Sequence, residues 1–195
     1  MPKNRKYTGG FRNGKFHWLG RFWAIGSYSY KGEWKNGKQH GKGKLIFDTS
    51  EIFTGYFKND KKIFGKWRFE DGNEYEGKIK NEMAHGMGKG TFKKSGKKYI
   101  GQYKNGAFHG KGKWWTPKGE TYMGQFKNGE RHGKGKQFFS KGEVAGTKYI
   151  GEWKNNLKSG KGTMTYYDGA KYSGQWESDE YNGKGTLIDT EGAKF

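Results

Sequence analysis

One pattern recurs about every 23 residues along the whole sequence, and this period constrains the fold more than any other feature. The pattern is clearest between Tyr30 and Gly43, where alternating aromatic and glycine residues precede Asn-Gly and then His-Gly-Lys-Gly. A fixed period of this length indicates a stack of similar supersecondary units. The repeats begin at Tyr7, Tyr30, Phe53, Tyr75, Tyr99, Tyr122, Tyr149 and Tyr172.

We divide the chain into a loose basic N-terminal lead, residues 1–6, and eight repeats over 7–195. The third repeat is one residue short in its turn region, so we expect a distorted hairpin there. The sixth carries an insertion within 140–147, which we expect in a loop. The repeat boundaries are 7–29, 30–52, 53–74, 75–98, 99–121, 122–148, 149–171 and 172–195.

Composition limits the kind of core that this chain can build. Hydrophobic residues make up 30% of the sequence and the net charge is +20, a combination typical of disordered chains. However, 18% of the residues are aromatic and recur periodically. Each aromatic ring buries roughly 150–250 Å², so few are needed in each repeat. We therefore expect an ordered chain with a thin aromatic core.

Each repeat is predicted to form a β-hairpin. Counting from the first aromatic residue as position 0, Tyr30, Gly32 and Trp34 occupy positions 0, 2 and 4 and share one face of a strand. Asn-Gly at positions 6 and 7 accepts the positive φ angles of a tight turn. With a turn over positions 6–9, position 4 lies opposite 11, 2 opposite 13, and 0 opposite 15, so Trp34 neighbours Gly41. Aromatic rings then cover glycines.

Stacked hairpins predict an all-β fold, an elongated single-layer antiparallel sheet that advances by roughly 10 Å per repeat. The repeats resemble those of the MORN (membrane occupation and recognition nexus) family over nearly all 195 residues. The resemblance implies a scaffold or adaptor role in ciliary, cytoskeletal or membrane-junction assemblies. It also implies phospholipid binding, self-association, or capture of a partner helix in an aromatic groove.

Catalytic and metal-binding constellations are not apparent. With no cysteine, disulfides and thiolate metal sites are excluded. Equivalent histidines in neighbouring repeats should lie roughly 10 Å apart, too far to share one Zn²⁺, so we expect a hydrogen-bonding role for them. The Gly-x-Gly matches do not precede a helix and are hairpin glycines. We predict no enzyme activity, cofactor or metal. The histidines at position 10 are His17, His40, His85, His109 and His132.

The period-two alternation predicts two chemically different faces. One face should offer an aromatic groove to a partner helix or peptide, and the opposite face should present lysines to anionic surfaces. The predicted groove residues are Tyr30, Trp34, Tyr99, Tyr103, Trp114, Tyr122, Phe126, Tyr149, Trp153, Tyr172 and Trp176. The predicted anion-binding residues are Lys35, Lys58, Lys80, Lys104, Lys127, Lys154, Lys42, Lys111, Lys134 and Lys161.

Two functions follow from these faces. The first is a non-catalytic scaffold that binds a protein partner on its aromatic groove. The second is a peripheral membrane protein that binds anionic phospholipids through its lysine face. Nucleic acid is disfavoured, because base-stacking aromatics should share a surface with the cations. The open sheet ends suggest a homodimer. No apolar run reaches the roughly 20 residues needed to span a bilayer, and no hydrophobic segment follows the basic N-terminus, so we expect an intracellular, cytoplasmic protein.

Overall fold

A computed structural model describes residues 4–195. The chain forms two compact halves, an N-terminal half that ends at Lys94 and a C-terminal half over Ser95–Phe195. The strands of the N-terminal half are β1 (Arg5–Arg12), β2 (Lys15–Ala24), β3 (Tyr28–Lys35), β4 (Lys38–Phe47), β5 (Ile52–Lys58), β6 (Lys61–Arg68), β7 (Glu74–Lys80) and β8 (Met83–Phe92). Those of the C-terminal half are β9 (Lys97–Lys104), β10 (Ala107–Trp115), β11 (Glu120–Lys127), β12 (Glu130–Phe139), β13 (Lys148–Lys154), β14 (Leu157–Thr165), β15 (Lys171–Glu177) and β16 (Glu180–Ile188).

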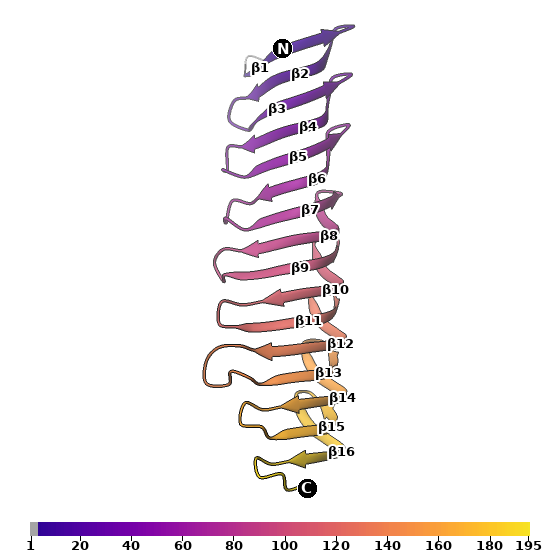
Figure 1. Ribbon diagram of the computed structural model, residues 1–195. Helices are drawn as coiled ribbons and strands as arrows, with labels where there is room; N and C mark the ends of the chain where they lie inside the picture. The colour runs from indigo at the N-terminus through magenta and orange to yellow at the C-terminus, as the bar shows by residue number, and fades with distance from the viewer. Residues whose placement is uncertain (1–3) are drawn as a thin grey trace. The chain divides into compact units, whose positions relative to one another are not determined.

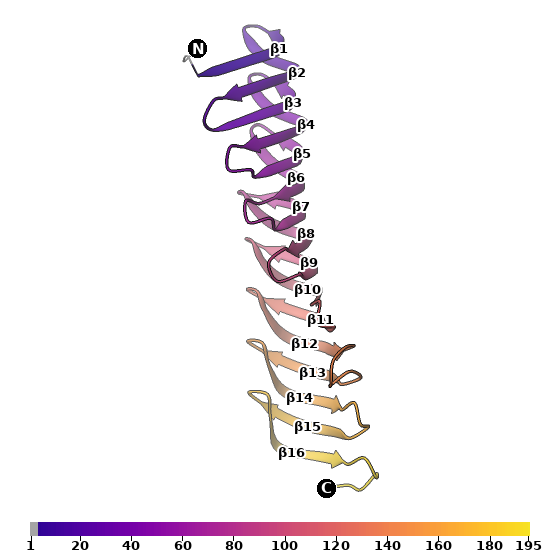
Figure 2. The ribbon, with the colours of Figure 1, turned by 90° about the vertical axis from the view of Figure 1, so that its left-hand side faces the viewer.

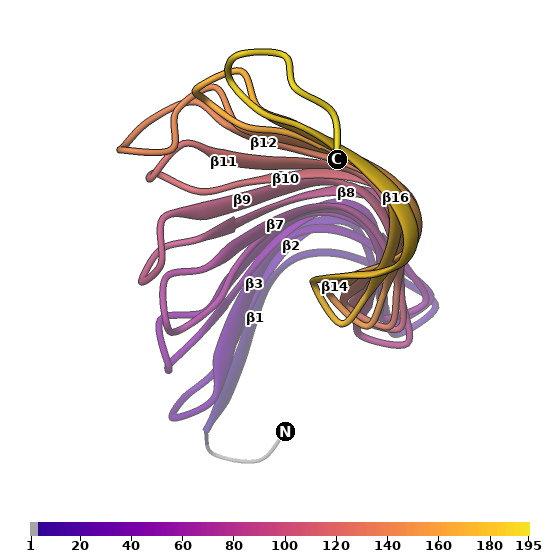
Figure 3. The ribbon, with the colours of Figure 1, turned by 90° about the horizontal axis from the view of Figure 1, so that it is seen from below.

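In each half the strands lie side by side in sequence order, and each pairs antiparallel with its chain neighbours. Figure 1 shows this order for β1–β8, and Figure 2 shows it for β9–β16. The predicted all-β fold of stacked antiparallel hairpins is therefore confirmed. Figure 3 shows that the strands are bent along their length instead of running straight.

The turn inside each repeat is shorter than predicted. Strand β3 ends at Lys35 and β4 begins at Lys38, so the turn contains only Asn36 and Gly37. Their φ angles are 52° and 82°, as a two-residue hairpin turn of type I′ requires. The turn also links repeats, because the Gly37 N–H donates to the Phe16 carbonyl of the preceding repeat at 2.9 Å.

The shorter turn changes the hairpin register. Gly32 lies opposite Gly43 and Tyr30 opposite Leu45, which confirms the predicted pairs of positions 2 with 13 and 0 with 15. The predicted Trp34–Gly41 pair is wrong, because Trp34 lies opposite Gln39. A bulge after position 10 absorbs the two residues that the turn does not use. Position 11 is glycine because the bulge places it in the left-handed region, with φ of 56° at Gly41.

Tyrosine at position 0 lies directly over the paired glycines. A Cβ built on Gly32 would lie 2.5 Å from both the Tyr30 hydroxyl oxygen and the Gly43 Cα, so no side chain fits there. The Tyr30 hydroxyl donates to the Glu33 carbonyl at 3.0 Å, where the bulge interrupts the strand ladder. The glycine pair therefore makes room for the ring, and the ring satisfies a carbonyl group at the bulge.

The rings pack edge to face from one repeat to the next. The Tyr122 ring lies 5.0 Å from Phe126 in its own repeat and 5.3 Å from Trp153 in the following one. Tyr149 repeats this arrangement, at 5.2 Å from both Trp153 and Trp176. Edge-to-face contacts at these distances are favourable beyond the area that they bury. The single layer thus contains its own core on one side of the sheet, which we call the ring face.

The irregular repeats keep the same hairpin. In the third repeat the turn at Asn59 is regular, and the missing residue shortens the bulge, where only Ile63 is extra. The insertion within 140–147 forms the loop between β12 and β13. Of the expected lead, Arg5 and Lys6 already belong to β1, and residues 1–3 lie outside the described part of the chain.

Candidate functional site

The predicted aromatic groove is closed by its own packing. Of the predicted groove residues only Trp114 is half-buried, and the others are buried; Tyr30 is 1% exposed and Tyr99 0%. Their rings contact one another and the glycines, so they present almost no surface to a partner. The prediction that these residues form a partner groove is therefore corrected: they are the core.

The ring face also carries cations, which sequence analysis placed only on the opposite face. The Arg131 guanidinium carbon lies 4.3 Å from the Trp153 ring centroid, and the Lys62 ammonium lies 4.2 Å from that of Trp67. Burial lowers the pKa of Arg131, and neighbouring Glu120 opposes this effect. Both side chains are at position 9, which pairs with position 4. The two-residue turn thereby places position 9 on the ring face. They close the core further.

The face opposite the rings, here called the outer face, remains free. It carries positions 1, 3 and 5 of the first strand of each repeat and positions 12, 14 and 16 of the second. All ten predicted anion-binding lysines are exposed. Lys42 shows how positions 12 and 3 meet on this face, because it pairs with Tyr56 of the next repeat and its ammonium lies 5.8 Å from that ring.

Three cations of the outer face stand directly opposite one another in the N-terminal half. Arg21 on β2 pairs with Lys31 on β3, which pairs with Lys44 on β4. Within residues 4–195 none of the three forms an ion pair. Like charges directly opposite on adjacent strands repel, so this row costs stability unless an anion lies over it.

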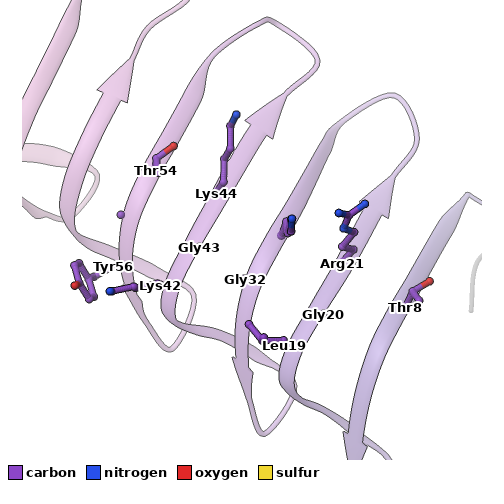
Figure 4. A pocket seen from close by; sticks show the side chains of 12 residues that line it. Thr8, Leu19, Gly20, Arg21, Gly32, Lys42, Gly43, Lys44, Thr54 and Tyr56 are labelled. Atoms are coloured by element: carbon purple, nitrogen blue, oxygen red, sulfur yellow. The ribbon is translucent and has the colours of Figure 1, made fainter.

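A shallow hollow of about 670 Å³ lies over these strands. In Figure 4, Thr8, Arg21, Lys44 and Thr54 stand in one line across the strands, and Leu19, Lys42 and Tyr56 form a second line. The floor is backbone, because the glycines of positions 2 and 13 run between the two lines. None of the lining residues is acidic. They are Thr8, Leu19, Gly20, Arg21, Lys31, Gly32, Lys42, Gly43, Lys44, Thr54, Gly55 and Tyr56.

The C-terminal half has a corresponding hollow of about 530 Å³, with a different lining. Position 1, which is Thr54 in the third repeat, is Met123 in the sixth repeat and Ile150 in the seventh. These two apolar residues line the hollow together with Lys134, Lys136 and Lys161. Glu152 is the one acidic residue in this lining, and its carboxylate accepts the Lys161 backbone N–H at 3.4 Å. This hollow therefore combines apolar and cationic contacts.

Position 3 caps the bulge beneath the outer-face lysines, a role that sequence analysis missed. The Gln125 side-chain carbonyl accepts the Lys134 backbone N–H at 3.0 Å, and Gln102 does the same for Lys111 at 2.9 Å. Glu33 accepts from Lys42 at 2.8 Å. The signal was present, because position 3 is Glu or Gln in five of the eight repeats, at Glu33, Gln102, Gln125, Glu152 and Gln175.

The histidines lie beside the bulge. Nδ1 of His17 accepts the Asn36 backbone N–H of the next repeat at 3.4 Å. Among residues 4–195 the buried Nδ1 atoms of His40, His85, His109 and His132 have no hydrogen-bond partner, so the expected hydrogen-bonding role is not confirmed for these four. In the part of the chain that the structure describes, no group of three or more His, Asp or Glu side chains could hold a metal ion. Residues 4–195 contain no helix with the length and apolar character needed to cross a membrane.

The fold and the repeat together define a solenoid of β-hairpins. The sequence profile of the MORN repeat matches residues 7–28, 30–50, 99–121, 122–144, 149–171 and 172–194. These segments cover more than half of the chain, which therefore belongs to the MORN-repeat family, as the resemblance predicted. Residues 53–98 fall between the matched segments, yet β5–β8 form the same hairpins there.

Solved structures resemble this fold at low sequence identity. A mutant of the TCP10 domain of Danio rerio CPAP aligns with a TM-score of 0.50 at 12% identity, covering 100% of this chain and 94% of that chain. The TCP domain of Drosophila melanogaster SAS-4 (dCPAP), in complex with a proline-rich motif of Ana2 (dSTIL), aligns with a TM-score of 0.49 at 14% identity, covering 80% and 82%. No curated protein matches the sequence.

Proposed function

We propose that this chain is a non-catalytic scaffold that docks an acidic protein partner on its outer face, within a larger intracellular assembly. The observation that carries the proposal is that one face of the sheet is buried as the core while the other face is exposed. The aromatic rings of the ring face pack against one another in the core, whereas the lysine rows and the two hollows of the outer face are exposed to solvent.

The charge of the outer face supports an acidic partner. Arg21, Lys31 and Lys44 face one another without an ion-pair partner among residues 4–195, so a carboxylate placed over them relieves repulsion and adds attraction. The net charge of +20 also accelerates the encounter with an acidic surface. The partner surface thus moves from the predicted aromatic groove to the opposite side of the sheet.

Site-specific photocrosslinking in the native cell tests this proposal. A photoreactive residue at position 54 lies in the N-terminal hollow, and one at exposed position 143, in the β12–β13 loop, serves as the control. We expect a discrete protein adduct from position 54 but not from position 143. The partner is then identified from the adduct, purified separately and titrated with the wild-type chain.

In the same titration, the Lys31→Glu/Lys44→Glu double variant should bind the purified partner much more weakly than the wild-type chain does, because two attractive contacts become repulsive. Both side chains are exposed, so the fold should persist, which circular dichroism checks. Equal affinity for the wild-type and the double variant would overturn the proposal. Sedimentation with phosphatidylserine vesicles, or binding to an oligonucleotide, in place of any protein adduct would instead assign the face to lipid or to nucleic acid.

A further inference from the structure

One row of the outer face in the C-terminal half alternates between apolar and cationic side chains. Ile100 on β9 pairs with Lys113 on β10, which pairs with Met123 on β11. Met123 pairs in turn with Lys136 on β12, and Lys136 with Ile150 on β13. We call these five residues the alternating row. Its three apolar members are exposed, Met123 by 53%.

This alternation is particular to the C-terminal half. The equivalent row in the N-terminal half reads Lys31, Lys44, Thr54, Lys66 and Glu76, without an apolar residue. The hairpin itself therefore does not require Ile100, Met123 and Ile150, since the same positions elsewhere are polar. Three apolar side chains exposed in regular alternation with lysines need another explanation, and a docked partner supplies one.

The spacing of the row selects the conformation of the partner. Adjacent strands lie about 4.8 Å apart, so the apolar residues repeat about every 9.6 Å, with a lysine midway between them. An α-helix laid across the strands advances about 10.5 Å in seven residues, which returns it to the same face. Its residues i+3 and i+4 lie on that face halfway along, above the lysines.

Other conformations fit this row less well. An extended strand advances about 10 Å in three residues, but its third residue points to the opposite side. A polyproline helix returns to the same face after three residues, about 9.3 Å, and leaves no side chain directed at the lysine midway. Only the helix places an apolar residue and an acid alternately on one line.

We propose that the alternating row docks an amphipathic acidic helix of the partner, with apolar residues seven positions apart and a glutamate or aspartate midway between them. This inference rests on the proposed function and specifies the partner segment. Half-buried Trp115 and exposed Phe138 flank the row on one side and provide further apolar contact. Lys111 and Lys134 flank it on the other side and extend the cationic contact.

Fluorescence anisotropy with designed peptides tests the inference. The matched peptide carries leucines at i, i+7 and i+14 and glutamates at i+3 and i+10. A peptide of identical composition with the glutamates moved to the opposite helix face is the control. We expect the matched peptide to bind the wild-type chain about tenfold more tightly than the control, since only its acids face Lys113 and Lys136.

Two pairs of variants then locate the binding. Lys136→Glu should weaken the matched peptide about tenfold or more, whereas Lys44→Glu, at the same position of the second repeat, should change its affinity less than about twofold. Met123→Thr, which copies the residue of the third repeat, should weaken it by loss of apolar contact, whereas Thr54→Ser should not. All four side chains are exposed, and thermal unfolding verifies that each variant folds.

The outcomes separate this inference from the proposed function. Equal binding of the two peptides, or equal losses in Lys136→Glu and Lys44→Glu, would mean that net charge alone attracts the peptide, and would overturn the inference. The proposed function would survive that result if the crosslinked partner still bound the outer face. If the wild-type chain bound phosphatidylserine vesicles more tightly than the matched peptide, and Lys136→Glu abolished its sedimentation with the vesicles, the row would be assigned to lipid. That result would also overturn the inference.

Discussion

At the scale of single residues, the chain depends on the contact between the position-0 ring and the glycine pair beneath it. Gly135 shows the requirement, since a Cβ built on it would lie 2.5 Å from the Cζ atom of the buried Tyr122 ring. Gly129, in the turn, has a different requirement: its φ is 91° and nothing lies within 4 Å of an added Cβ. Steric exclusion fixes the first glycine and backbone conformation the second.

These two glycines should respond differently to alanine. Gly135→Ala should cost about 3 kcal/mol of unfolding free energy, at the upper end for overpacking, because Tyr122 cannot move out of the core. Gly129→Ala should cost about 1–2 kcal/mol, the strain of a left-handed residue. Urea unfolding measures both. In a Tyr122→Leu background the cost of Gly135→Ala should shrink while that of Gly129→Ala stays, and a failure of this coupling would contradict the ring–glycine explanation.

The buried tyrosines should also make stability depend on alkaline pH. Burial raises the pKa of Tyr75 and Tyr122 from 10.0 to about 12, because the phenolate loses its hydration in the core. The folded state thus favours the neutral phenol. This stability is fully present below pH 10.0, the unfolded value, and is lost as the pH rises from there toward about 12.

The measurement is the unfolding free energy across that pH range for the wild-type chain and Tyr122→Phe. Phenylalanine keeps the ring, as Phe53 does naturally at position 0 of the third repeat, but it cannot ionise. The variant should lose less stability between the two pH values than the wild type does. Because both chains have the same lysines, parallel pH profiles would rule out tyrosine ionisation as the cause.

At the scale of the hairpin, the bulge is the element that shapes each repeat. It allows a two-residue turn, brings position 9 onto the ring face, and frees a backbone N–H that a position-3 side chain caps. Sequence analysis predicted the strands and the Asn-Gly turn correctly, because both depend on local preferences. It misplaced the turn boundary, since glycine tolerates a bulge and a longer turn equally well.

The cap should be measurable at one amide. Gln125→Leu removes the acceptor of the Lys134 N–H, which should cost about 1 kcal/mol and accelerate hydrogen exchange at the Lys134 amide. Gln125→Glu should retain protection, because Glu33 and Glu152 cap the same position in other repeats. Unchanged exchange in the leucine variant would show that the cap contributes nothing to the bulge.

At the scale of the whole molecule, the positive charge opposes folding. The chain carries a net charge of +20, and its outer-face cations stand opposite one another on adjacent strands. Such self-repulsion destabilises the compact state and is screened by salt. An acidic partner would relieve the same repulsion, so stability and binding share one electrostatic origin.

Salt should therefore stabilise the free protein. Raising NaCl from a low concentration to about 0.15 M should raise Tm by a few degrees, because the Debye length shrinks to about 8 Å. Lys31→Glu, which converts two repulsive cross-strand pairs into attractive ones, should raise Tm at low salt and reduce its salt dependence. A Tm that falls with salt in both chains would contradict this electrostatic explanation.

The period, the strand faces and the reversal of the chain at Asn-Gly could all be predicted from the sequence, because alternation and Asn-Gly preference act over a few residues. Sequence analysis also placed the exposed lysines correctly, since charged side chains seldom leave water. Two features could not be predicted in this way: Trp34 lies opposite Gln39, and the tyrosine rings close the groove. The register depends on the bulge within the hairpin, and the closure of the groove depends on rings that pack against those of the next repeat. Neither is encoded in the local alternation.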